Sequence, residues 1–307
     1  MKIVFFGSDD FANVHLEALI ASHYDVVATV TQPDRPKGRG MKVILSPIKE
    51  TALKNNIDVL QPTAFDDDVI FKLASYKADY FIVIAYGRIL PKAVLDIPKK
   101  HSINVHGSLL PKYRGAAPIN WAVINGDDLT GLTVMLMDIK MDAGDILTQK
   151  EIPIKLSDTA NDIRNQMMLK GPSFLIESLD QVSNDKVKPQ EQNEADVTYA
   201  KKMSKQLARI DWNKPAVNVL NLVRGLSPWS NAFTVYKNKQ LKILSAHIVE
   251  AVIKCPGEVV EVLKDSFIVS TVDGNLNIEN VHLENSKPMS VDSFLRGHDL
   301  KVGDRFE

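Results

Sequence analysis

The chain has 307 residues, of which 45% are hydrophobic and 24% are charged. This composition excludes an intrinsically disordered chain, and the length is that of about two globular domains. The 37 basic side chains nearly balance the 38 acidic ones, which excludes a surface uniformly coated with positive charge. The single Cys255 excludes an internal disulfide and a thiolate zinc site. No apolar stretch has the length of a signal peptide or a membrane span, so we expect a cytoplasmic protein.

The first half of the chain alternates short apolar runs with segments of helical spacing. The runs are almost continuously apolar, which is typical of parallel strands that are covered on both faces. Ser46 and Pro47 supply an N-cap and a first-turn proline for one of the helices. The pattern predicts an α/β domain of βαβ units, with strands at 2–6, 25–30, 79–85, 102–106 and 132–138 and helices at 10–22, 47–56, 65–76 and from after Ser157 to about Val182.

The character of the sequence changes after residue 182. Residues 182–216 are polar with sparse apolar positions, as in a linker, and a helix is predicted near 215–226. Short alternating runs follow, separated by Asn, Gly, Asp and Lys, and they predict a small antiparallel barrel. The predicted strands of this barrel are 232–236, 240–249, 258–263, 266–271, 275–283 and 302–306.

Charge is distributed unevenly along the chain. Residues 1–200 carry 22 basic and 26 acidic groups, a net charge of −4. Residues 201–245 carry nine basic groups and one acidic group, a net charge of +8, and residues 246–307 carry six and eleven, a net charge of −5. Such a basic band is expected where a polyanion contacts the boundary between two domains. From charge alone, a solvated linker is an equally good interpretation.

Several common catalytic motifs are absent. Gly7 follows the first strand, but FFGSDDF lacks the second and third glycines of a dinucleotide-binding loop and places two carboxylates where phosphates would bind. The sequence has no P-loop, no HExxH and no GxSxG motif, and its seven histidines are not clustered as metal ligands. These absences disfavour a nicotinamide cofactor and metal catalysis.

The tripeptide Asn-Val-His occurs three times, beginning at Asn13, Asn104 and Asn280. On a strand, residues two apart face the same way, so the copy at 104–106 places an amide beside an imidazole at the carboxyl end of a strand, where α/β proteins bind ligands. The first copy lies in a helical pattern, which separates the two side chains, and the third lies in the small barrel. Only the middle copy is at an expected site.

The segment after His106 strengthens this hypothesis. HGSLLPKYRGAAPINWAVINGD is a Gly- and Pro-rich loop with a predicted exposed Arg114, followed by a helix from about Pro118. Further on, a turn after a strand offers three carboxylates. One of them beside His106 would favour the imidazolium form and fix its orientation. Backbone capping is the better interpretation for Asp138 and Asp145, and for Asp142 the two interpretations are even.

With these motifs in place, the chain resembles the methionyl-tRNA formyltransferases over nearly its whole length. The resemblance is carried by FFGSDDFA at the start, QPDRPKGRG at 32–40, AYGRILP at 85–91, NVHGSLLPKYRGAAPI at 104–119, DAGD at 142–145 and YAKKMSKQLARIDW at 199–212. It implies a Rossmann-like, parallel-sheet formyltransferase domain at 1–182, a basic linker at 183–206 and an OB-like, tRNA-binding β-barrel domain at 207–307.

The resemblance also implies a reaction. The formyl group of 10-formyltetrahydrofolate is expected to pass, without a metal, to the α-amino group of methionyl-initiator tRNA for translation initiation. Asn104, His106 and Asp142 match the catalytic trio of the family. The folate donor is expected to contact two stretches, which are Ser108, Leu109, Leu110 and Pro111 and then Tyr86, Gly87, Arg88, Ile89 and Leu90.

The tRNA is expected to contact two basic groups of residues. The loop at 32–46 is expected to enter the acceptor-stem end, with Arg39 as the main contact, although a mobile surface loop is the local alternative. The basic band is expected to hold backbone phosphates, with steep salt dependence. The expected contacts are Arg35, Lys37, Arg39 and Lys42 in the loop and Lys201, Lys202, Lys205 and Arg209 in the band.

Two positions depart from the family pattern. Lys140 stands where the family commonly has a glycine, which can alter the turn between Asp138 and Asp142. Residues 227–231 read SPWSN where the family tends to have NPWPG, and we expect Trp229 there to pack in the core.

Three other functions stay open, and we rank them below the main interpretation. The acceptor could be a sugar amine or a glycinamide ribotide, although neither requires the basic band and barrel. The chain could be an RNA-binding protein with an inactive α/β domain, against which the intact trio argues. It could also hydrolyse formyl-folate with the same three residues. We expect a monomer.

Overall fold

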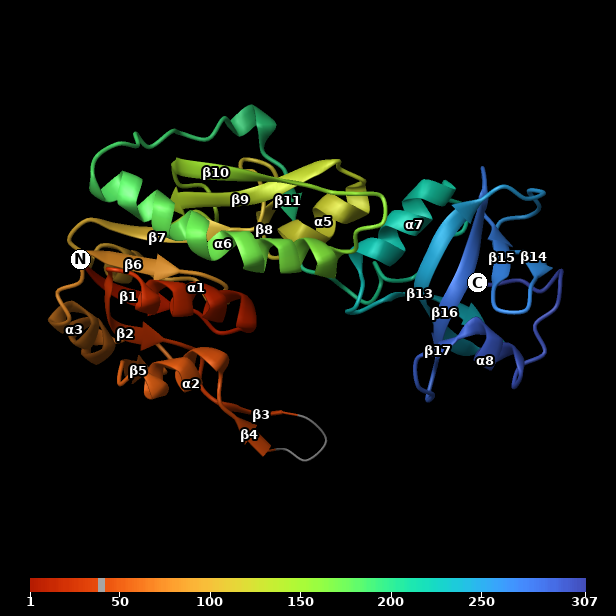
Figure 1. Cartoon of the computed structure of the whole chain (residues 1–307), viewed down its shortest axis with the longest axis horizontal. Helices are drawn as coiled ribbons and strands as arrows, with labels where there is room; N and C mark the ends of the chain where they lie inside the picture. The colour runs from red at the N-terminus through yellow and green to blue at the C-terminus, as the bar shows by residue number, and fades with distance from the viewer. Residues whose placement is uncertain (38–41) are drawn as a thin grey trace. The chain divides into compact units, whose positions relative to one another are not determined.

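The computed structural model describes residues 1–37 and 42–307 and divides the chain into two compact units (Figure 1). The first unit contains a seven-stranded sheet, and the second contains a smaller antiparallel sheet. Both units are discontinuous in sequence. The first comprises Met1–Gly115, Gly131–Ile152 and Arg164–Tyr199, and the second comprises Ala116–Thr130, Pro153–Ile163 and Ala200–Glu307.

A seven-stranded sheet forms the centre of the first unit, in the order β10-β9-β7-β6-β1-β2-β5. The five strands from β7 to β5 are parallel, and the apolar runs predicted four of them, β7, β6, β1 and β2, but not β5. Strand β9 pairs with β7 in the antiparallel direction. The sheet is therefore mixed rather than wholly parallel. Its strands are β1 (Lys2–Phe6), β2 (Asp25–Val30), β5 (Asp58–Leu60), β6 (Tyr80–Val83), β7 (His101–His106), β9 (Leu129–Leu136) and β10 (Ile146–Pro153).

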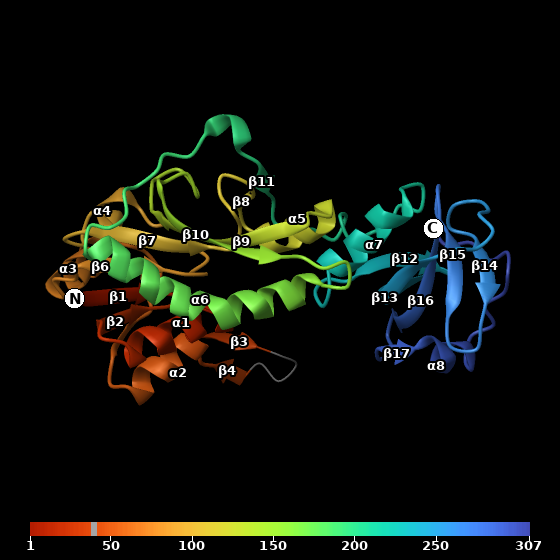
Figure 2. The ribbon, with the colours of Figure 1, turned by 45° about the horizontal axis from the view of Figure 1, so that its top comes forward.

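Helices cover both faces of this sheet. Alternate side chains of a strand point to opposite faces, so each face presents its own apolar side chains to a layer of helices. Val4 and Phe6 of β1 pack in one cluster with Leu73 of α3 and Val94 of α4. The helices α1 and α6 lie against each other elsewhere in this unit, where His15 meets Gly171 (Figure 2). The helices are α1 (Asp10–Ala21), α2 (Pro47–Lys54), α3 (Asp67–Ser75), α4 (Lys92–Leu95) and α6 (Ala160–Ser183).

Side-chain caps fix where these helices begin. The side chain of Asp9 accepts from the amide of Ala12 at the start of α1. Ser46 accepts from Lys49 at the start of α2, with Pro47 in the first turn, as the sequence predicted. A hairpin of β3 (Arg35–Lys37) and β4 (Lys42–Ile44) precedes α2.

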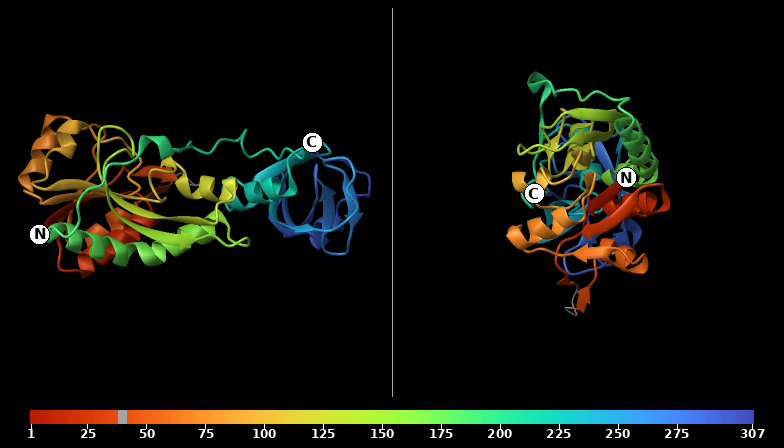
Figure 3. Two further views of the ribbon diagram at one scale, coloured as in Figure 1. Left: turned by 90° about the horizontal axis from the view of Figure 1, so that it is seen from above. Right: turned by 90° about the vertical axis from the view of Figure 1, so that its left-hand side faces the viewer.

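The second unit contains an antiparallel sheet in the order β12-β13-β16-β15-β14, with β17 paired to β16. Its strands lie toward the blue, C-terminal end of the chain in Figure 3. The predicted last strand at 302–306 is wrong, because this segment forms turns and a single bridge from Arg305 to Glu258. The strands are β12 (Ala232–Tyr236), β13 (Lys239–Val249), β14 (Val259–Val262), β15 (Phe267–Ser270), β16 (Asn275–Leu283) and β17 (Met289–Ser290), and they are accompanied by α7 (Ala216–Gly225) and α8 (Val291–Leu295).

A helix from the first half of the chain, α5 (Pro118–Asn125), packs within this second unit against α7. The side chain of Asn120 donates to the carbonyl of Gly225 at 2.7 Å. The indole of Trp121 donates to the carbonyl of Lys201 at 2.7 Å. The core of the second unit therefore extends onto residues that precede its sheet in sequence by about a hundred positions. The division of roles among 1–182, 183–206 and 207–307 stays a prediction.

The polar segment at 182–216 makes specific contacts. It contains a short 3-10 helix, η1 (Glu194–Asp196), and strand β11 (Tyr199–Ala200), which pairs with β8 (Arg114–Gly115). The residues from Gln190 to Thr198 thereby lie beside the loops that follow the sheet. No helix in the described ranges is long and apolar enough to cross a membrane.

Candidate active site

The middle Asn-Val-His copy ends strand β7, beside the point where the strand order of the sheet reverses between β1 and β6. Such reversals open a crevice at the carboxyl ends of parallel strands. Asn104 Nδ2 donates to the carbonyl oxygen of Val83 on β6 at 3.0 Å. Its Oδ1 is buried and has no hydrogen-bond partner among the described residues. The amide thus keeps one hydrogen on Nδ2 beyond that used for Val83.

His106 is 7% exposed, and both of its ring nitrogens have a defined neighbour. Nε2 lies 2.9 Å from the carbonyl oxygen of Tyr113. A carbonyl only accepts, so Nε2 carries a hydrogen and donates it there. Nδ1 lies 3.7 Å from Oδ2 of Asp142. The ring is therefore held at one nitrogen and directs the other toward a carboxylate.

Asp142 reaches His106 from the turn between β9 and β10. Its φ of 53° is in the left-handed region, which aspartate tolerates better than most residues. Its Oδ2 accepts from the amide of Gly115 at 2.8 Å. A Cβ at Gly144 would overlap the carbonyl of Leu136, so this turn requires glycine at that position.

The other two aspartates of this turn contribute to its own backbone structure. Asp138 Oδ1 accepts from the amide of Lys140 at 2.9 Å, which is the predicted backbone capping. The main-chain carbonyl of Asp145 accepts from the amide of Leu136. Lys140 is exposed and is accommodated in the turn.

The expectation of an exposed Arg114 is wrong. The residue is 4% exposed, its Nε donates to Oε1 of Gln192 at 3.0 Å, and its Nη2 lies 2.9 Å from Glu194. Gln192 in turn donates to the main chain of the Asp142 turn. The polar, linker-like sequence around Gln192 gave no signal of this contact, because nothing in its pattern marks a buried side chain.

The stretches expected to bind folate include both buried and exposed side chains. Ser108 is fully buried and donates to the carbonyl of Lys112, and Leu110 is 3% exposed. Tyr86 and Leu90 are also buried, whereas Ile89 is 78% exposed. The described residues contain no group of three or more His, Cys, Asp or Glu that could hold a metal ion.

Arg88 of the same stretch is used within the protein. Its guanidinium donates to the carbonyls of Pro62 and Thr63 at 2.7 and 2.6 Å. Gly87 has a φ of 77°, in the left-handed region that favours glycine. Pro111 and Leu109 are half-buried. The turn of the Asp142 loop adds two further apolar side chains, Ile139 and Met141, each 62% exposed.

The basic residues expected to contact tRNA fall into two groups. Lys201, Lys202, Lys205 and Arg209 are all exposed on the second unit. Arg39 lies outside the described residues, and Arg35, Lys37 and Lys42 lie on strands β3 and β4.

Two of the tryptophans, Trp229 and Trp212, differ in burial. Trp229 is 68% exposed, so the expectation that it packs in the core is wrong. The loop that carries Trp229 is held by the main-chain N–H of Asn231, which donates to the carbonyl of Leu226 at 3.0 Å. Trp212, in contrast, is 4% exposed, and its indole donates to Thr234.

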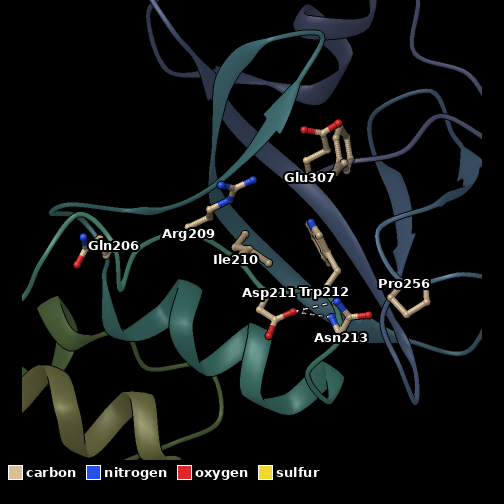
Figure 4. Close-up of a pocket in the computed structure, with 9 residues that line it drawn as sticks. Gln206, Arg209, Ile210, Asp211, Trp212, Asn213, Pro256 and Glu307 are labelled. Carbon is tan, nitrogen blue, oxygen red and sulfur yellow. Dashed lines mark hydrogen bonds between the residues drawn. The ribbon is translucent and has the colours of Figure 1, made fainter.

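A pocket of about 430 Å³ opens on the second unit beside Trp212 (Figure 4). Its walls include the carboxylates of Asp211 and Glu307 and one guanidinium, that of Arg209. The carboxylate of Asp211 accepts from the main chain and side chain of Asn213. The excess of carboxylates disfavours a phosphate ligand here, and none of the trio lines the pocket.

Known proteins match the chain over nearly its whole length. Family models described as formyl transferase and formyl transferase C-terminal domain match residues 1–179 and 202–299. Methionyl-tRNA formyltransferases of Clostridium novyi and Clostridium tetani are 43% and 44% identical to the chain, and each match covers at least 98% of both proteins.

Solved structures share the fold at lower identity. An N-formyltransferase from Helicobacter canadensis superposes with a TM-score of 0.70 at 20% identity, over 92% of this chain and 100% of that one. The sugar 3N-formyl transferase WlaRD gives a TM-score of 0.69 at 21% identity, over 94% and 99%. On the sequence matches over nearly its whole length, the chain belongs to the methionyl-tRNA formyltransferase family.

Proposed function

We propose that this protein transfers the formyl group of 10-formyltetrahydrofolate to the α-amino group of methionine on initiator tRNA. The observation that carries the proposal is the arrangement of His106, whose Nε2 is fixed by Tyr113 while Nδ1 faces Asp142 at 3.7 Å. Membership of the family supports the same reaction.

The reaction requires stabilisation of negative charge on the formyl oxygen. Attack of the amine nitrogen on the formyl carbon forms a C–N bond and converts the carbonyl oxygen into an oxyanion. Hydrogen-bond donors that are already in place where this charge develops lower the barrier. In the imidazolium form, Nδ1–H of His106 is one donor, because the 3.7 Å to Asp142 Oδ2 is too long for a hydrogen bond and leaves this hydrogen available. The remaining hydrogen on Asn104 Nδ2 is a second donor.

Proton transfer completes the exchange. The attacking amine must lose a proton, and N10 of the folate must gain one as its bond to the formyl carbon breaks. Asp142 is placed for this step because its carboxylate is 17% exposed and its Oδ2 is oriented by Gly115. A water molecule between Asp142 and the reacting nitrogens would relay the proton.

The donor site is proposed along the loops that follow β6 and β9. Ile89, Ile139 and Met141 expose large apolar side chains there, which suits the flat ring system of a folate. The buried Ser108, Leu110, Tyr86 and Leu90 would support the walls of this site rather than touch the donor through their side chains. Related solved structures were obtained with folinic acid and with tetrahydrofolic acid, which supports a folate donor.

The tRNA is proposed to contact the exposed basic residues of the band, with the β3–β4 hairpin as the second contact. Lys201, Lys202 and Lys205 would neutralise backbone phosphates, which contributes affinity but little sequence selectivity. Trp229 adds an exposed indole to the same unit, and unpaired bases stack on such side chains.

The test is transfer of labelled formyl from 10-formyltetrahydrofolate to charged initiator tRNA. Uncharged tRNA, charged elongator tRNA, a sugar amine, glycinamide ribotide and a reaction without acceptor are run beside it. We expect label on the charged initiator tRNA, with the rate lowered about 10²- to 10³-fold in His106→Ala. His101→Ala, an exposed histidine at the start of the same strand, is the matched control and should keep the wild-type rate.

The other outcomes identify the competing functions. Label on the sugar amine or the ribotide, and none on tRNA, indicates a small-molecule formyltransferase. Formate released without an acceptor indicates a hydrolase. A protein that binds tRNA but turns over no folate contradicts the proposal outright.

A further inference from the structure

Gln192 is a buried amide side chain in a segment whose sequence resembles a linker. It is 5% exposed, and it lies between the Asp142 turn and Arg114. Neither the reaction nor the basic character of the neighbouring band accounts for a buried glutamine at this place.

The three hydrogen bonds of Gln192 use both ends of its amide. Nε2 donates to the main-chain carbonyl of Asp142 at 2.9 Å and to that of Gly144 at 2.8 Å. Oε1 accepts from Nε of Arg114 at 3.0 Å. Both donor hydrogens are therefore spent on the main chain that carries the carboxylate. That main chain is in the left-handed region at Asp142, a conformation that persists only when its surroundings hold it.

Arg114 connects this contact to both catalytic neighbours. The residue before it, Tyr113, accepts from His106, and the residue after it, Gly115, donates to the carboxylate of Asp142. The main-chain amide of Arg114 donates to the carbonyl of Thr198 at 2.9 Å. The segment 113–115 thus holds both the imidazole of His106 and the carboxylate of Asp142. Gln192 holds the main chain of the turn that carries Asp142.

We infer that Gln192, supported by Arg114, is a positioning residue that holds Asp142 at its working distance from His106. The inference rests on the proposed function, since Asp142 is assigned a proton-transfer role there. Gln192 touches neither substrate nor the reacting atoms. It acts through the main chain of Asp142, where a displacement of about 1 Å is enough to lower a rate about 100-fold.

Two variants separate hydrogen bonding from packing. Gln192→Glu keeps the size of the side chain and an acceptor for Arg114, but directs a carboxylate at two carbonyl oxygens. Gln192→Met keeps the length and removes all three hydrogen bonds. Gln190→Ala is the matched control, because Gln190 is exposed and its bonds to Ile146 run through the main chain, with no side-chain bond to any residue that the structure describes.

We expect kcat for formyl transfer to fall about 10- to 100-fold in both Gln192 variants, with KM for each substrate within about twofold of wild type. The control should keep the wild-type kcat. In an Asp142→Asn background, Gln192→Met should lower kcat by less than about twofold, because residues that act through one another are not additive.

A second measurement does not depend on activity. The ring resonances of His106, followed by NMR in folded protein, should shift in Gln192→Glu and Gln192→Met and stay in place in Gln190→Ala. Folded variants with wild-type kcat and unshifted His106 resonances would overturn the inference, as would an undiminished effect of Gln192→Met in the Asp142→Asn background. A wild-type protein that transfers no formyl group contradicts the proposed function instead, and the NMR comparison still decides the role of Gln192.

Discussion

Helix α1 and the end of strand β7 carry the same tripeptide, Asn-Val-His, in opposite surroundings. On α1, His15 is fully buried, its Nδ1 donates to the carbonyl of Phe11 at 2.8 Å, and its Nε2 has no partner in the described part of the chain. Burial lowers the pKa of His15 to about 4. On β7, His106 meets a carboxylate instead. The tripeptide alone is therefore not a catalytic motif. It becomes a candidate site where it ends a strand and lies beside Asp142.

Of the changes considered, removal of the carboxylate charge beside His106 should have the largest effect on the rate of formyl transfer. In Asp142→Asn, the group that faces Nδ1 of His106 no longer carries a charge and no longer accepts a proton. We expect formyl transfer to fall by a factor on the order of 10² to 10³, with little change in melting temperature. Steady-state kinetics and thermal unfolding measure both. A variant that keeps a tenth or more of the wild-type rate would remove Asp142 from the mechanism.

The free energy of unfolding should depend on pH because His15, the histidine of the buried copy, is neutral in the folded state. Because the pKa of His15 is about 4 in the folded state and that of an unperturbed histidine is 6.5, the unfolded chain binds the proton first as pH falls. The native state is therefore destabilised between about pH 6.5 and pH 4, by up to roughly 3 kcal/mol.

Urea unfolding at several pH values tests this prediction. In His15→Leu, which does not titrate, the loss of stability over that interval should be smaller than in wild type by about the same amount. Equal pH dependence in the two proteins would mean that His15 is not buried in its neutral form.

Gly171→Ala should destabilise the region around His15 without affecting catalysis. A Cβ at Gly171 would lie 2.5 Å from Nε2 of His15, and the ring cannot turn away without losing its bond to Phe11. Overpacking of this kind costs about 1–3 kcal/mol. The free energy of unfolding should drop by that amount while kcat stays constant, and a second change, His15→Ala, should cancel part of the loss.

The third copy of the tripeptide should show the smallest effect. His282 on β16 is half-buried, and its Nε2 bonds to the carbonyl of Ser286 at 3.0 Å. His282→Ala should lower the free energy of unfolding by about 1 kcal/mol or less and leave formyl transfer unchanged. A large loss of activity would instead give His282, on the sheet of the second unit, a role in the reaction.

The sequence predicted most strands of the two sheets because their signals are local. Apolar runs and caps marked β1, β2 and α2 within a few residues. The direction of β9 could not be predicted, since its apolar run is compatible with either parallel or antiparallel pairing. The segment at 302–306 alternates in pattern and hydrogen-bonds to Gly257 and Val259 through its main chain, but it begins with a turn and forms an isolated bridge at Arg305 rather than a strand.

The candidate site was predicted in part. Asn104 and His106 were singled out by their place at the carboxyl end of a strand, since spacing alone did not distinguish the three copies, whereas the choice of Asp142 over its neighbours came from the family resemblance. Burial of Arg114 and Gln192 depends on contacts between positions 78 residues apart, which no local pattern records. The exposure of Trp229 is the converse case, since an aromatic residue in a short loop is compatible with either core or surface.

The packing of α5 against α7 has a consequence for synthesis of the chain. Ala117, Trp121 and Ile124 pack against the core of the second unit, most of which is made after residue 200. At about 5–20 residues per second, α7 follows α5 out of the ribosome after roughly 5–20 s. During that interval Trp121 and its neighbours lack their partner. A fragment that ends after residue 182 would keep that apolar surface permanently, so aggregation of such a fragment is expected even where its own sheet is complete.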